Sequence, residues 1–143
     1  MSDLTIERHF DADPEIVFAY LTETQKLLQW WGPEGITISE HSLDLSRPGP
    51  WNSTMVNAKG DIYKVSGEVI AVEDNTFIEF TWAWHDNNDM RGHESRVRFD
   101  VKPGTSGGTA FTLTQTGLAD EDSAAAHDEG WTSSLAKLER TLK

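Results

Sequence analysis

The chain has 143 residues, no cysteine and a formal net charge of −12 at pH 7, from 24 acidic and 12 basic side chains. This length is typical of one domain with a real core, and the lack of cysteine excludes disulfides, thiolate metal sites and thiol nucleophiles. The acidic balance disfavours nucleic acid and anionic membrane surfaces, because binding to phosphates depends on basic groups.

The hydropathy pattern contains no membrane-spanning or exported segment. No apolar run reaches the roughly 18 residues that a transmembrane helix needs, and the N-terminus lacks the pattern of a signal peptide. We therefore expect a cytoplasmic protein without membrane insertion.

The first part of the chain predicts one strand followed by two short helices. Leu4–Phe10 alternates apolar and polar residues, as in a strand with one buried face. Arg8 falls on that face, where it either pairs with an acid or lies at the strand edge with its guanidinium in water. Asp13-Pro14-Glu15 is a helix start, and a second helical piece begins near Thr24 and ends at Gly32-Pro33.

The rest of the chain predicts six strands and a long helix. The strands alternate with turn residues, which favours an antiparallel meander. They are expected over Ile36–Leu45, Trp51–Ala58, Ile62–Val72, Thr76–Trp84, Glu94–Val101 and Thr109–Thr116. After Asp120, apolar residues and one histidine recur at spacings of three and four, which predicts an amphipathic helix packed on the sheet. This stripe comprises Ala124, His127, Trp131, Leu135, Leu138 and Leu142.

Several motifs along the chain together resemble one protein family. They are Val17–Thr22, Gln29-Trp30-Trp31-Gly32-Pro33, Arg47-Pro48-Gly49-Pro50-Trp51, Gly67–Val72, Phe80-Thr81-Trp82 and His127–Trp131 with Leu135 and Leu138. In this order and spacing they resemble the activator of heat-shock-protein-90 ATPase homologue family, a branch of the START-like superfamily of polyketide cyclases and lipid-transport proteins. The resemblance extends from Ile6 to Leu142, and it departs at Pro50, where many members have a second glycine.

The resemblance implies an α+β helix-grip fold over residues 1–143, in the order β-α-α-β6-α. In this fold a curved antiparallel sheet wraps round a long C-terminal helix and leaves an elongated apolar cavity. Members of the superfamily bind lipids, sterols and polyketides, some cyclise polyketides, and the eukaryotic branch stimulates a chaperone. That last activator has an extra N-terminal domain, so its role is the least transferable to this chain, and the fold alone leaves the function open.

Ten residues are candidates for the wall of such a cavity, because the six tryptophans exceed what a packed core of this size needs. The candidates are Trp30, Trp31, Trp51, Met55, Tyr63, Phe80, Trp82, Trp84, His127 and Trp131. The alternative is that most of them only fill the core. Adjacent helical residues diverge by about 100°, so we expect Trp30 to anchor under the sheet and Trp31, beside Gly32-Pro33, to close the cavity mouth.

His127 is the most informative polar candidate, because it precedes Trp131 by one helical turn on the buried stripe. A neutral imidazole there could fix a ligand carbonyl or hydroxyl, or move a proton. The alternative is a structural histidine hydrogen-bonded to its neighbours. The polar run His85–Glu94 lacks helical ligand spacing and predicts a solvated loop, so we expect no metal site and no cofactor, and hydrolase motifs are absent.

Three functions remain open on these residues. The first is a non-enzymatic protein that binds a small hydrophobic or aromatic ligand in the cavity. The second is a cyclase-like or isomerase-like enzyme in which His127 or Tyr63 transfers a proton. The third is a module that binds a chaperone through an exposed apolar face. The sequence leaves both a monomer and a homodimer open.

Overall fold

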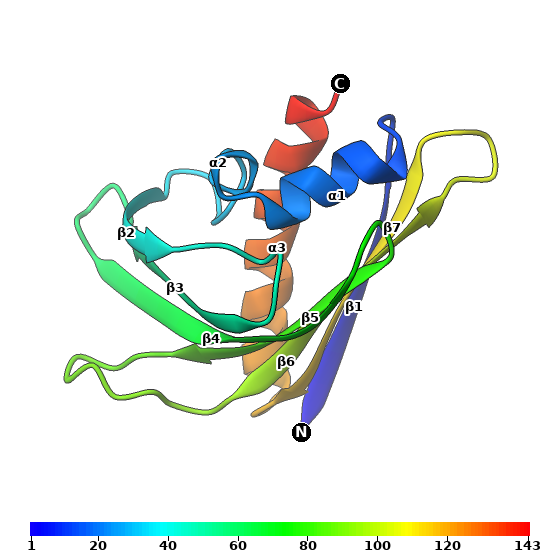
Figure 1. Ribbon diagram of the computed structural model, residues 1–143. Helices are drawn as coiled ribbons and strands as arrows, with labels where there is room; N and C mark the ends of the chain where they lie inside the picture. Colours follow the sequence, from blue (N-terminus) through cyan, green and yellow to red (C-terminus); the bar gives the residue numbers. More distant parts are fainter.

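A curved seven-stranded antiparallel sheet and one long helix form the framework of the structure, a computed structural model that describes residues 1–143 (Figure 1). The elements are β1 (Ser2–Phe10), α1 (Pro14–Thr22), α2 (Thr24–Leu27), β2 (Thr37–Ser42), β3 (Gly49–Val56), β4 (Ile62–Glu73), β5 (Phe77–Trp84), β6 (Ser95–Pro103), β7 (Thr109–Leu118) and α3 (Glu121–Thr141). The predicted α+β class and order of elements are confirmed.

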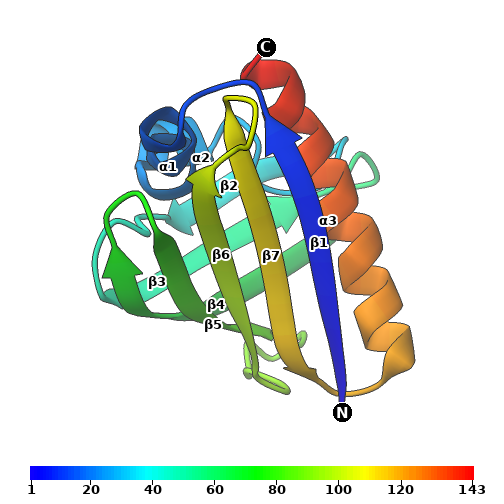
Figure 2. The same ribbon diagram turned by 90° about the vertical axis from the view of Figure 1, so that its right-hand side faces the viewer.

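The sheet has the strand order β1-β7-β6-β5-β4-β3-β2, with every neighbouring pair antiparallel. Strands β2 to β7 therefore form the predicted meander, and β1 joins its far edge beside β7. Figure 2 shows this edge, with α3 running along the sheet behind β1. In Figure 1 α3 runs from the foot of the curved sheet to the top of the molecule, and α1 and α2 lie above the open side of the sheet. This is the helix-grip arrangement.

The inner face of the sheet forms the core. In β1 the predicted residues Leu4, Ile6 and Phe10 are buried. Arg8 is half-buried and has no acidic partner; its guanidinium donates to the backbone oxygen of Glu7 at 2.7 Å. Of the two alternatives for Arg8, the structure therefore shows the one without an ion pair.

The start of helix α3 and the residues that it buries against the sheet agree with the sequence pattern. The carboxylate of Asp120 accepts a hydrogen bond from the backbone N–H of Ser123 at 2.8 Å, which satisfies one free donor of the first turn. Trp131, Leu135 and Leu138 are buried, while Ala124, His127 and Leu142 at the two ends of the stripe are half-buried.

Strand β2 is shorter than predicted, because the chain leaves the sheet after Ser42. Leu43 and Leu45, expected inside the strand, instead turn into the core and are 1% and 0% exposed. The backbone N–H of Leu45 donates to the carbonyl of Thr22 at 3.2 Å, so this segment is tied to the end of α1 rather than to β3.

A close approach between β4 and β5 requires glycine at position 67. A Cβ placed there would lie 1.9 Å from the backbone oxygen of Thr81, well inside the contact limit. The same carbonyl accepts the indole N–H of Trp51 at 3.2 Å, and the hydroxyl of Thr81 accepts the backbone N–H of Glu68 at 2.8 Å. Thr81 and Gly67 thus hold an irregular stretch of the sheet against Trp51.

Candidate functional site

A cavity of about 280 Å³ lies between α3, the segment after α2, and strands β3 and β5. Its wall is mainly aromatic and apolar, and no Asp, Glu, Lys or Arg side chain contributes to it. The lining residues are Trp31, Gly32, Pro33, Met55, Trp82, Trp84, Ala126, His127, Gly130, Trp131 and Ser134.

Six of the ten predicted wall residues meet around this cavity: Trp31, Met55, Trp82, Trp84, His127 and Trp131. The other four lie elsewhere. Trp30, Trp51 and Phe80 are packed in the core with at most 1% exposure, and Tyr63 is 44% exposed at the start of β4. Alternation along a strand identifies the face of each residue, but it does not determine how far along that face the cavity extends.

The sequence prediction missed five lining residues, and three of them share a recognisable spacing. Ala126, Gly130 and Ser134 follow one another at intervals of four on α3, so they form one stripe of small side chains beside His127 and Trp131. Small residues on a helix face that meets large aromatics leave space between the two layers. Gly32 and Pro33 close the same cavity from the segment after α2.

The two adjacent tryptophans have different roles, one of which the sequence predicted wrongly. Trp30 is the expected anchor: it is fully buried, and its indole N–H donates to the backbone oxygen of Tyr20 at 2.8 Å. Trp31 does not close the cavity mouth as expected, because it is only 2% exposed and its indole N–H donates to the hydroxyl of Ser53 at 3.0 Å. It forms a fixed inner wall of the cavity.

Trp31 also lies at the centre of a cluster of aromatic rings. Its ring centroid is 5.6 Å from that of Trp51 and 5.9 Å from those of Trp82 and Trp131. Trp82 in turn lies 5.1 Å from Trp131 and 5.4 Å from Trp84. Tilted and edge-to-face pairs at these distances are favourable, so the tryptophans brace one another and keep the wall in place.

His127 is hydrogen-bonded on both ring nitrogens. Its Nδ1 lies 2.7 Å from the backbone oxygen of Ser123, which only accepts, so Nδ1 carries the proton. Its Nε2 accepts the indole N–H of Trp84 at 3.0 Å. Burial lowers the pKa of His127 below its ordinary value, opposed by the bond to Ser123, and the imidazole is neutral near pH 7. Of the two alternatives for His127, a free imidazole that contacts a ligand or a structural histidine bonded to its neighbours, the structure shows the second.

A buried polar chain behind the cavity was not predicted. The indole N–H of Trp131 donates to the amide oxygen of Gln115 at 2.9 Å, and the amide nitrogen of Gln115 donates to the hydroxyl of Ser95 at 2.9 Å. Gln115 is completely buried in β7. The one signal in the sequence was a large polar residue at an inward position of a strand, after the inward apolar residues Phe111 and Leu113.

Trp82 is the exception among the indoles of the wall. The indole nitrogen of Trp82, Nε1, is buried and has no hydrogen-bond partner. No other buried side-chain nitrogen or oxygen atom is left unpaired in this way. Leaving such a donor unpaired costs about 1–3 kcal/mol. The indole nitrogens of Trp31, Trp84 and Trp131 all donate to protein acceptors.

Comparisons with known proteins identify the family of this arrangement. A family model described as "Activator of Hsp90 ATPase homolog 1-like protein" matches residues 11–143. Among solved structures, the AHSA1 protein of Silicibacter pomeroyi is 48% identical and superposes with a TM-score of 0.94, covering 99% of this chain and 97% of that one. A search of curated proteins gave no match.

More distant solved structures share the fold alone. A protein of Chromobacterium violaceum superposes with a TM-score of 0.86 at 19% identity, covering 99% of this chain and 98% of its own. A protein of Mycobacterium smegmatis superposes with a TM-score of 0.82 at 22% identity, covering 99% and 90%. In this chain, no helix has the length and apolar character required to cross a membrane.

Proposed function

The chain belongs to the family of activator of Hsp90 ATPase homolog 1-like proteins, and we propose that it binds a small, neutral, hydrophobic or aromatic ligand in the cavity between α3 and the sheet. The observation that carries this proposal is the cavity itself, a space of about 280 Å³ walled by four tryptophans. Sites for small molecules are concave and mostly apolar, with few polar groups.

The composition of the wall defines the ligand. No charged side chain lines the cavity, so a charged ligand would lose its hydration without gaining a partner. The nitrogens of Trp31, Trp84, Trp131 and His127 are engaged within the protein. The ligand therefore gains its affinity mainly from apolar and aromatic contact with the rings.

The alternative of a cyclase-like or isomerase-like enzyme has less support. Tyr63 lies outside the cavity and is 44% exposed, so only His127 of the two proposed proton carriers faces a ligand there. Proton transfer at Nε2 would require its bond with the Trp84 indole to open first. The geometry therefore favours binding without turnover.

The chaperone alternative requires a continuous apolar docking face. The large exposed apolar side chains are instead distributed over several elements: Met1, Ile16, Ile62, Tyr63, Ile70 and Met90. They belong to the N-terminus, α1, β4 and the β5–β6 loop. Isolated exposed apolar residues of this kind are ordinary on protein surfaces, so they favour the cavity over a docking face.

Titration with the neutral fluorescent probe N-phenyl-1-naphthylamine tests the proposal, with native mass spectrometry as the count of bound molecules. The matched pair is Gly130→Leu and Gly130→Ala. A Cβ at Gly130 meets only Pro33 Cγ, at 3.8 Å, so the alanine fits, whereas leucine extends into the cavity. We expect one probe bound by the wild type and by Gly130→Ala, and at least about tenfold weaker binding by a folded Gly130→Leu. Equal binding by all three proteins would contradict the proposal.

A further inference from the structure

Three side chains on the opposite face of the sheet are hydrogen-bonded in series. The hydroxyl of Ser66 lies 2.6 Å from His85 Nε2, and His85 Nδ1 lies 2.7 Å from Asp89 Oδ1. Ser66 belongs to β4, His85 directly follows β5, and Asp89 lies in the loop before β6. Val65, which precedes Ser66 in β4, is fully buried on the inner face of the sheet. The side chain of Ser66 therefore points outward, away from the cavity.

The partners of these groups determine where the protons lie. Asp89 accepts hydrogen bonds from Lys64 and His85, which lower the pKa of its carboxyl below the usual value and keep it ionised. Because a carboxylate only accepts, Nδ1 of a neutral His85 carries the proton. His85 Nε2 therefore accepts the hydrogen bond that the Ser66 hydroxyl donates. This is the arrangement in which an imidazole acts as the general base for a serine nucleophile.

A cation is fixed beside the same hydroxyl. Arg91 donates from Nε to Ser66 Oγ at 3.0 Å and from Nη2 to the Ser66 backbone oxygen at 3.1 Å, while Nη1 pairs with Glu94 at 3.1 Å. The guanidinium is therefore held on three sides within hydrogen-bond distance of the hydroxyl. A charge placed in this way stabilises negative charge that develops at or beside the serine oxygen.

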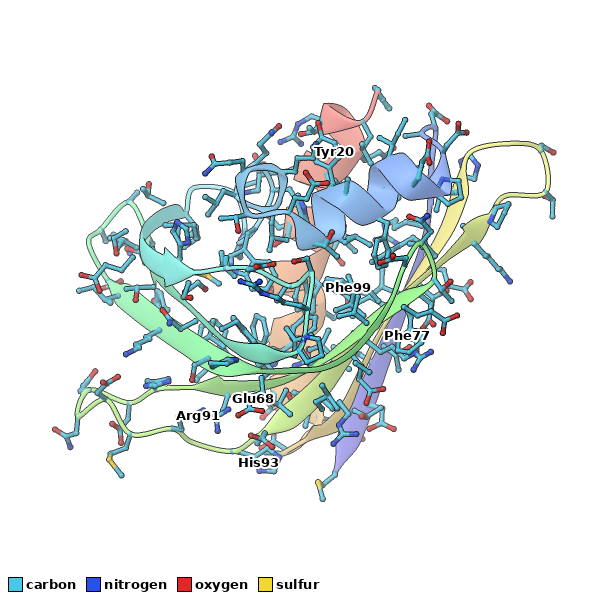
Figure 3. All side chains as sticks on the ribbon, in the orientation of Figure 1. Tyr20, Glu68, Phe77, Arg91, His93 and Phe99 are labelled. Carbon is cyan, nitrogen blue, oxygen red and sulfur yellow. The ribbon has the colours of Figure 1, made fainter.

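Ser66 is reached through an open polar groove of about 550 Å³. Lys64, Glu68, Arg91 and Glu94 contribute to its wall, together with Gly67 beside Ser66. Figure 3 shows Glu68 and Arg91 below the sheet, on the side away from α1. The groove carries four charged side chains, in contrast to the tryptophan-walled cavity, and suits a small ester with polar groups.

The loop does not depend on these three side chains for its closure. Backbone hydrogen bonds already tie it together, from His85 to Lys64 at 2.9 Å, from Asp86 to Met90 at 2.9 Å and from Gly92 to Trp84 at 2.8 Å. Asp89 adopts a left-handed backbone conformation, with φ of 62°, as aspartate and asparagine do in turns more often than other non-glycine residues.

From this geometry we propose that Ser66 is an activated nucleophile that accepts the acyl group of small polar esters. Ser66 Oγ attacks the ester carbonyl carbon while its proton passes to His85 Nε2, and Arg91 stabilises the oxyanion. The bond from carbon to the leaving oxygen then breaks, and His85 returns the proton to that oxygen. Water, deprotonated by His85, releases the acid and restores the hydroxyl. Ser66 and His85 are the catalytic residues, and Asp89 is a positioning residue.

Hydrolysis of p-nitrophenyl acetate by the full chain tests this proposal, with peptide mapping of the acetylated protein. We expect acetylation at Ser66 and turnover that falls to the buffer rate in Ser66→Ala and about 10²-fold or more in His85→Gln. Ser106→Ala, an exposed turn serine outside the groove, is the control and should match the wild type. Asp89→Asn should lower kcat and leave KM unchanged, which a purely structural role would not produce.

Two results would overturn the proposal. One is release of p-nitrophenolate by the wild type no faster than by Ser66→Ala, with both proteins folded by circular dichroism. The other is acetylation at Lys64 or other amines without acetyl-Ser66. If Ser66→Ala fails to fold, the acetylation map of the wild-type protein still decides the outcome. Because the groove and the cavity lie on opposite faces, failure here would leave the proposed ligand binding untouched.

Discussion

Replacement of Gln115 by leucine should destabilise the protein strongly, although leucine matches the apolar surroundings. Gln115 is completely buried, and its amide joins Trp131 to Ser95 through two hydrogen bonds of 2.9 Å. Leucine leaves the Trp131 indole N–H and the Ser95 hydroxyl buried without partners. Each such group costs about 1–3 kcal/mol, so we expect the free energy of unfolding to fall by about 2–6 kcal/mol.

Urea unfolding followed by far-UV circular dichroism measures this loss as a lower midpoint at unchanged slope. At about 3 °C per kcal/mol for a chain of this size, the melting temperature should fall by roughly 6–18 °C. The double variant Gln115→Leu/Ser95→Ala removes one of the two orphaned groups and should recover about 1 kcal/mol. A single variant within about 0.5 kcal/mol of the wild type would refute the view that this polar chain holds Trp131 in place.

Three further changes test other parts of the structure. Gly67→Ala places a Cβ 1.9 Å from the Thr81 carbonyl and should cost at least about 3 kcal/mol in urea unfolding; a cost below 1 kcal/mol would contradict the close approach. Asp120→Ala removes the cap of α3 and should cost about 1 kcal/mol, whereas Asp120→Asn should cost less; equal losses would argue against the cap. His127 has a lowered pKa when folded, so its unfolded form gains a proton before its folded form does as the pH falls below about 6.5. Wild-type stability should therefore decrease from pH 7 to 5 more than that of His127→Gln, and parallel curves would refute this.

The fold followed from the sequence because each element carries its own local signal. Alternation marked the buried face of β1, and Asp120 with its acidic followers marked the start of α3. The end of β2 could not be predicted in this way. Leu43 and Leu45 continue the apolar alternation of a strand, but they pack beneath the helices because Leu45 bonds to Thr22, far away in the sequence.

The candidate site was predicted only in part, for a similar reason. The aromatic residues gave a clear signal, yet Trp51 and Phe80 share the faces of true wall residues and lie deeper in the core. The open space itself is produced by small residues, Gly130 and Ser134, which carry no chemical signal of their own. The chain from Ser66 to Asp89 depends on tertiary contacts between β4 and a loop, so neither spacing nor composition indicated it.

Ligand binding in the cavity is measured residue by residue in an NMR titration of the six tryptophan indole N–H resonances with N-phenyl-1-naphthylamine. Each indole reports on its own position, and four of the six line the cavity. If the ligand binds there, the signals of Trp31, Trp82, Trp84 and Trp131 shift together at one equivalent of probe, while Trp30, which is packed beneath them, changes least. No shift at saturating probe, or shifts confined to Trp30 and Trp51, would contradict ligand binding in the cavity between α3 and the sheet.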